Sequence, residues 1–137
     1  MEKHFQLSDA VFELQFEEGR LDPAMFSHEA HLRLAWIHLH NYGMERACNN
    51  ICCQIKNYAS QLGLKDKYNK TVTVAAIKAV YHFMLKSSAD NFKDFIRESP
   101  RLKNAFKDLI DSHYGFDIFK SEKAKKEYLE PDLLPFD

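Results

Sequence analysis

The sequence predicts an all-α fold, a single-domain irregular bundle of about six helices over residues 1–137. Apolar residues recur at helical spacing along most of the chain, and only four glycines and four prolines interrupt it. Convincing strand patterns are missing. With 45% hydrophobic residues and 11 phenylalanines, a chain of this length can bury a core without a metal ion or a disulfide bond.

The first half of the chain predicts helices that begin at capping residues and end at glycines. Ser8 and Ser27 are placed as caps. The stretch "FELQFE" also suits a strand, but it has no evident partner strand. The expected elements are residues 8–18, a short turn at Asp22 and Pro23, residues 28–42 and residues 44–62.

The third expected helix carries the clearest apolar stripe of the sequence. Cys48 and Cys52 lie on or beside the stripe and are expected as small core residues, whereas Cys53 points the opposite way. The spacing C-x-x-x-C-C is not that of a common zinc site. The stripe consists of Met44, Cys48, Ile51, Ile55, Tyr58 and Leu62.

The second half predicts helices over residues 71–86, 90–98 and 101–113, and a short helix capped by Ser121. On the first of these, His82 is expected to be solvated. The chain ends in the segment "PDLLPFD", called the tail below. Its apolar residues Leu133, Leu134 and Phe136 suggest that the tail packs against the rest of the protein. The expected inner face of the 71–86 helix consists of Thr73, Ala76, Ile77, Val80, Phe83 and Met84.

Composition and charge argue against several classes of function. The net charge is −1 and the charges are mixed, so the basic face that nucleic-acid binding requires is not expected. No apolar run reaches membrane-spanning length. The three cysteines do not resemble a secreted disulfide framework, and no signal peptide is evident, so a cytoplasmic protein without a membrane partner is expected. The sequence predicts no oligomeric state.

The segment "FSHEAHLRLAW" places His28 and His31 three residues apart on one helix. On a helical wheel both share the side that carries Leu32, Ala35 and Leu39, so both are expected to face the interior. His38 lies ~15 Å beyond His28 along the helix axis, so it cannot bind the same single metal ion. Arg33 projects elsewhere and is expected to form an ion pair.

Three interpretations of the two histidines stay open. They can be buried side chains in a polar network, part of a pocket for a small polar or anionic ligand, or two ligands of a divalent metal ion. A metal ion would need further ligands from other helices. The pattern H-x-x-H is weaker evidence for a metal than H-E-x-x-H, which contains its own general base.

A second polar cluster, "KDKYNKTVT", lies at the expected start of the fourth helix. Lys67, Tyr68, Asn69, Thr71 and Thr73 belong to it. Free N–H groups and the helix dipole favour an anion at such a position. The alternative is a cap formed by Asn69 or Thr71, with exposed lysines. Since Thr73 lies on the apolar face, its hydroxyl must bond to the backbone or face a pocket.

The segments "FSHEAHLRLAW", "KYNKTVT" and "SEKAKKEYLEPD" resemble the ordered motifs of a family of small bacterial proteins of unknown function. The family pattern is F-[S/T]-H-x-x-H-[L/V]-R-x-A-W, K-Y-H-x-T-x-T and S-x-x-A-x-x-x-[F/Y]-x-x-P-D. The resemblance covers about residues 26–132 and implies a compact helical domain, with no known activity. It implies characteristic positions at His28, His31, Arg33, Trp36, Lys67, Tyr68, Thr71 and Thr73.

Asn69 stands where the family pattern has histidine. Asparagine cannot titrate, so this departure weakens the metal and acid–base interpretations and leaves ligand binding standing. We therefore expect a pocket for a small polar or anionic ligand, built on His28, His31, Lys67, Tyr68, Asn69, Thr71 and Thr73. The alternatives are a non-catalytic interaction module with a structural polar network, and a metal-dependent enzyme that uses His28 and His31. Whether the chain is an enzyme stays open.

Overall fold

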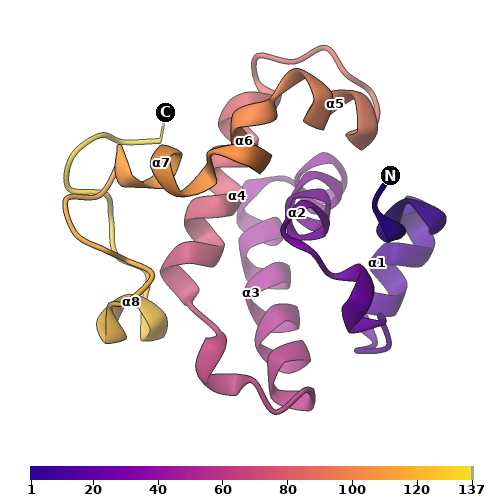
Figure 1. Cartoon of the computed structure of the whole chain (residues 1–137), viewed down its shortest axis with the longest axis horizontal. Coiled ribbons are helices and arrows are strands. Elements are labelled where there is room, and N and C mark those ends of the chain that lie inside the picture. Colours follow the sequence, from indigo (N-terminus) through magenta and orange to yellow (C-terminus); the bar gives the residue numbers. More distant parts are fainter. Residues whose placement is uncertain (137) are drawn as a thin grey trace. The chain divides into compact units, whose positions relative to one another are not determined.

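A computed structural model describes residues 1–136, and the regular elements of this range are all helices (Figure 1). The predicted all-α class is confirmed. Contacts between Cα atoms divide the chain into two compact units, residues 1–68 and the part from Asn69 onward, and each is described by itself. The expectation of one domain stays a prediction. Among the described residues, no helix combines the length and apolar character that crossing a bilayer requires.

The first unit contains three α-helices and three short 3₁₀ helices. Helix α2 packs against α3, and α1 contacts both. The elements in order are η1 (Lys3–Gln6), α1 (Asp9–Glu17), η2 (Pro23–Met25), α2 (His28–Tyr42), α3 (Met44–Gln61) and η3 (Lys65–Lys67).

The starts of these helices confirm the predicted caps. The Ser8 hydroxyl accepts a hydrogen bond from the N–H of Val11, and Ser27 does the same for Ala30. Asp22 caps the short helix that begins at Pro23. Glycines with positive φ, Gly19, Gly43 and Gly63, follow α1, α2 and α3 as expected.

Helix α2 is buried almost all round. Residues 29–39 are buried with the single exception of His31, and His28 is exposed. The prediction that His28 and His31 face the interior is therefore wrong, whereas His38 is buried. A wheel finds a buried side only where the opposite side is solvated, and α2 has no such contrast.

On α3, the buried stripe passes through Ile51 and Tyr58, as predicted. Cys48 and Cys52 are half-buried and Cys53 is exposed, which confirms the expected order of exposure. Leu62 was expected to belong to the stripe, but it lies just beyond the end of α3 and is 41% exposed.

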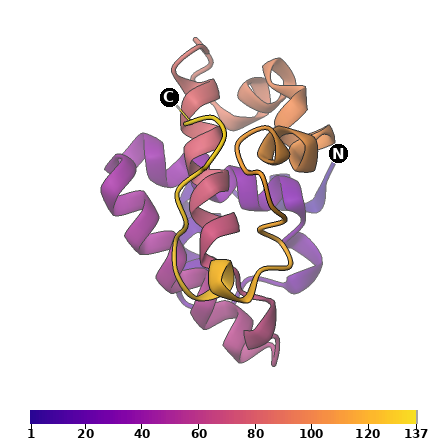
Figure 2. The same ribbon diagram turned by 90° about the vertical axis from the view of Figure 1, so that its left-hand side faces the viewer.

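The second unit is built around α4. Helix α8 packs on it, and the C-terminal segment runs beside it (Figure 2). Its helices are α4 (Lys70–Met84), α5 (Phe92–Glu98), α6 (Pro100–Asn104), α7 (Phe106–Asp111) and α8 (Glu122–Lys126).

The buried face of α4 is broader than predicted. Ile77 and Val80 are buried as expected, but Thr73 and Ala76 are only half-buried. The buried residues of α4 are Thr71, Val74, Ala75, Ile77, Ala79 and Val80. His82, expected to be solvated, is half-buried.

Two further differences from the sequence prediction concern the end of the chain. The single helix expected over residues 101–113 is broken at Ala105, whose φ of −136° and ψ of 35° are not helical. In the tail, Phe136 is buried as expected, whereas Leu133 and Leu134 are exposed. Phe136 is therefore the apolar anchor of the tail, and hydrogen bonds between His113 and the backbone of Leu133 and Leu134 hold it as well.

Candidate functional site

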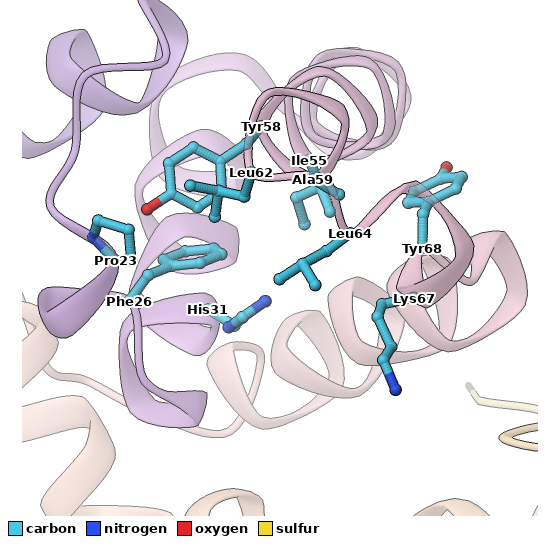
Figure 3. Close-up of a pocket in the computed structure, with 10 residues that line it drawn as sticks. All are labelled: Pro23, Phe26, His31, Ile55, Tyr58, Ala59, Leu62, Leu64, Lys67 and Tyr68. Carbon is cyan, nitrogen blue, oxygen red and sulfur yellow. The ribbon is translucent and has the colours of Figure 1, made fainter.

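The first unit contains a cavity of about 310 Å³ between the start of α2, the end of α3 and the chain that follows α3 (Figure 3). This volume is at the lower end of the range of small-molecule sites. Most of the lining is apolar, from Pro23, Phe26, Ile55, Ala59, Leu62 and Leu64. The polar side chains in the lining are His31, Tyr58, Lys67 and Tyr68.

His31 is held in place by two contacts. Its ring stacks on that of Phe26, with 3.8 Å between the centroids. Its Nδ1 lies 3.0 Å from the carbonyl oxygen of Ser27. A carbonyl only accepts hydrogen bonds, so Nδ1 carries the proton and Nε2 carries a lone pair. Nε2 has no hydrogen-bond partner within residues 1–136, so it is available to a ligand as an acceptor.

The surroundings of His31 keep it neutral. The ring touches solvent, but desolvation by the protein around it, with a smaller contribution from His28, lowers the pKa of His31 to about 4. The hydrogen bond to Ser27 acts in the opposite direction and is weaker. At neutral pH the imidazole is an uncharged acceptor.

The other polar lining groups differ in their availability. The hydroxyl of Tyr58 donates to the carbonyl of Leu21 at 2.8 Å and is already used. The hydroxyl of Tyr68 points away from the cavity (Figure 3), and burial, followed by a hydrogen bond with Cys52, raises the pKa of Tyr68. Lys67 is exposed and is the one lining residue within residues 1–136 that carries a permanent charge. The cavity thus offers one neutral acceptor and one cation.

The structure brings three of the predicted site residues, His31, Lys67 and Tyr68, to this cavity. His28 is exposed and lies outside its lining. Sequence reasoning did not anticipate Phe26 as the ring that orients His31. The spacing of five residues across the start of α2 is compatible with such a stack, but no local rule requires it.

Three predicted site residues lie in the second unit and are bonded to its backbone. Asn69 caps α4 by accepting from the N–H of Val72, and its amide donates to the carbonyl of Ile118 at 2.8 Å. The hydroxyl of Thr71 donates to the carbonyl of Glu127 and accepts from the N–H of Leu129. The hydroxyl of Thr73 donates to the carbonyl of Asn69.

A buried polar network that the sequence analysis missed joins η1 to α2. His4 is fully buried, and its Nε2 lies 2.9 Å from a carboxylate oxygen of Glu29. Arg33 donates to the carbonyls of His4 and Leu7 and to the carboxylate of Asp9. The predicted ion-pair role of Arg33 is thereby confirmed. The partners lie about 25 residues apart in the sequence, so no local pattern announces them.

This network also contains a group with the composition of a metal site. Ligand atoms of Glu2, His4 and Glu29 lie within 4.8 Å of one another. However, Nη1 of Arg33 lies 3.4 Å from Nδ1 of His4, and a guanidinium only donates. Nδ1 must then accept and Nε2 must carry the proton that is shared with Glu29. A metal ion on Nε2 would require the opposite tautomer and would set two donors against each other.

Within residues 1–136, neither His28 nor His31 belongs to a group of three or more potential metal ligands. The metal site on these two histidines stays a prediction. Comparisons with protein-family models, with curated proteins and with solved structures find no match for the chain. The geometry of the cavity is therefore the basis for any functional proposal.

Proposed function

We propose that the cavity of the first unit binds a small organic molecule with an apolar body, a hydroxyl group and an anionic end. The observation that carries this proposal is the lone pair of Nε2 on a neutral, stacked His31 within an otherwise apolar lining. The ligand's hydroxyl donates to His31. Its anionic end is accommodated by Lys67 at the solvent side.

The two kinds of lining serve different purposes. The apolar side chains supply most of the affinity, at roughly 25 cal/mol for each Å² of apolar surface removed from water. The acceptor on His31 supplies selectivity, because a ligand that lacks the donor leaves a desolvated nitrogen without a partner. Lys67 contributes less, since an exposed ion pair stabilises by at most about 1 kcal/mol.

The low basicity of His31 favours binding over proton transfer. A general base works best when its pKa lies near the working pH, and the pKa of His31 is about 4. The imidazole accepts a hydrogen bond at neutral pH without taking the proton. We therefore propose a binding function and assign no reaction to the chain.

The test uses two probe molecules that differ in one group, 4-hydroxyphenylacetate and 4-methylphenylacetate. The hydroxyl probe is expected to bind about tenfold tighter by titration calorimetry, although the methyl probe is the more apolar. His31→Phe keeps an aromatic ring against Phe26 and removes the acceptor. In this variant the preference is expected to disappear. An unchanged preference in His31→Phe would refute the role of Nε2.

Filling the cavity provides an independent test. Ala59 lines the cavity from α3, and Ala59→Leu adds volume with a residue that favours helix. Both probes are expected to lose at least tenfold in affinity. The neighbouring, exposed Ser60→Leu is the matched control and is expected to leave both affinities unchanged. Equal effects of the two substitutions would contradict binding in this cavity.

A second candidate function is an interaction module in which the residues at the start of α4 form a structural network. It is supported by the backbone bonds of Asn69, Thr71 and Thr73, whose side chains are each engaged by the protein itself. Failure of both probes to bind, together with strong destabilisation by Thr71→Val, would favour this candidate.

A further inference from the structure

The second unit contains a cavity of about 410 Å³ with a different chemistry (its elements are visible in Figure 2). It lies between the end of α4, helices α6 and α7, and the C-terminal tail. Its lining includes two permanent cations, Lys86 and Arg101, and two imidazoles, His82 and His113. Within residues 1–136, no acidic side chain contributes to the lining.

The two cations come from different elements and are not neutralised. Lys86 follows the end of α4, and Arg101 lies in α6. Neither forms an ion pair with another residue in the described part of the chain, although other lysines and arginines of this unit do. Two like charges on one cavity repel each other, and a bound anion would offset this repulsion.

The third polar group is oriented by the fold. His113 is 9% exposed, its Nδ1 lies 2.7 Å from the carbonyl of Leu134, and its ring stacks on Phe136 with 4.1 Å between the centroids. Because a carbonyl only accepts, Nδ1 carries the proton. The free polar atom of this nearly buried ring is Nε2, which has no partner within residues 1–136.

The tail closes one side of the cavity. The N–H of Leu133 donates to the carbonyl of His113 at 3.0 Å, so the backbone, the ring and Phe136 fix the tail together. Phe136, Phe83 and Leu109 add apolar surface to the lining that also carries the two cations. This combination matches a molecule with an oxyanion and a flat apolar part.

We infer that this cavity is a second binding site, which takes an organic oxyanion of the phosphate monoester or carboxylate class. Arg101 can donate two parallel hydrogen bonds to such a group, and Lys86 adds a compact charge. Nε2 of His113 accepts from a hydroxyl of the ligand or from a protonated phosphate oxygen. This site is separate from the cavity of the first unit in position within the chain, and its lining carries two permanent cations where the first carries one.

The test measures binding of phenyl phosphate, inorganic phosphate and phenol to the full chain. Phenyl phosphate is expected to bind at least tenfold tighter than either of the others, because it uses both the cations and the apolar surface. Its NMR shift changes are expected at His82, His113 and Phe136 and not at His31. Equal affinities for phenyl phosphate and phenol, or shift changes confined to the first unit, would overturn the inference.

A matched pair of variants tests the role of charge. Arg101→Gln is expected to weaken phenyl phosphate about tenfold, as expected for loss of a charge-assisted hydrogen bond. Arg97→Gln alters an exposed arginine outside the cavity lining and is expected to change the affinity less than twofold. The same loss of affinity for phenyl phosphate in both variants would show a non-specific attraction to positive charge and would refute the site. Both residues are exposed, so folding is preserved.

Discussion

The ring of His31 stacks on the ring of Phe26, with 3.8 Å between centroids and 29° between planes. This stack places an unprotonated Nε2 at an apolar cavity, while Nδ1 is committed to the backbone of Ser27. The pair converts a surface histidine into an oriented acceptor.

The pKa of His31 predicts how stability depends on pH. The unfolded chain binds a proton at the ordinary histidine pKa of 6.5, and the folded chain binds it at about 4. Between these values the unfolded state holds more protons, so the free energy of unfolding falls as the pH falls from 6.5 to 4. Thermal unfolding across this range is expected to show a falling Tm.

The variant His31→Gln separates this contribution from others. Burial also lowers the pKa of His4 and of His38, so part of the slope is expected to persist in the variant, with a shallower dependence overall. NMR titration of the His31 ring gives the direct measurement. A midpoint at or above pH 6.5 would show that the cavity does not hold this ring neutral.

Arg33 predicts a large loss of stability on truncation. Arg33→Leu leaves the carbonyl of Leu7 without the guanidinium donor, removes one of the two donors to the carbonyl of His4, and removes the ion-pair partner of Asp9. We expect the free energy of unfolding to fall by about 2–4 kcal/mol in urea denaturation. Arg20→Leu, which removes an exposed pair with Glu18, is expected to cost less than about 1 kcal/mol. Similar losses for both variants would contradict the importance of the buried network.

Thr71 predicts a local effect in the second unit. Thr71→Val removes one hydrogen bond to the carbonyl of Glu127 and one from the N–H of Leu129, at similar side-chain volume. Destabilisation by about 1–3 kcal/mol is expected, together with faster hydrogen exchange of the Leu129 amide. Thr73→Val, at a half-buried position, serves as control and should leave that amide protected. Unchanged exchange at Leu129 in Thr71→Val would argue against the bond.

Replacement of His38 by an apolar residue is expected to stabilise the protein. Its side chain is 1% exposed, and neither ring nitrogen has a hydrogen-bond partner within residues 1–136. Replacement of such a group by an apolar one of similar volume removes a desolvation penalty. His38→Leu is expected to raise the free energy of unfolding by about 1 kcal/mol. A loss of stability in this variant would indicate that the imidazole is satisfied in solution.

The sequence predicted helix starts well because capping is local. Ser8, Ser27, Asn69 and Ser121 all accept from the N–H three residues ahead, and each is recognisable from its own short stretch. The break at Ala105 could not be predicted in this way. Ala105 is neither glycine nor proline and alanine favours helix, so no local preference indicates a break at this position.

The candidate site was predicted less completely, because some of its contacts join residues that lie far apart in the sequence. Of the predicted site residues, Lys67, Tyr68 and His31 line one cavity. The inward orientation of His28 was wrong because the wheel assumed that one side of α2 is solvated. His4 and Glu29 are brought together by a reversal of the chain between them, and the spacing of apolar residues in the sequence does not indicate this reversal.

The bonds from Arg33 to the carbonyls of His4 and Leu7 hold the N-terminal segment by its backbone. Both bonds are accepted by backbone carbonyl oxygens, which every residue type carries, and not by particular side chains. Residues 1–7 are held on α2 much as a peptide is held by a receptor. Lys3 and Gln6 are exposed, so substitutions of their side chains are expected to leave this attachment intact, whereas substitution of Arg33 is expected to release it.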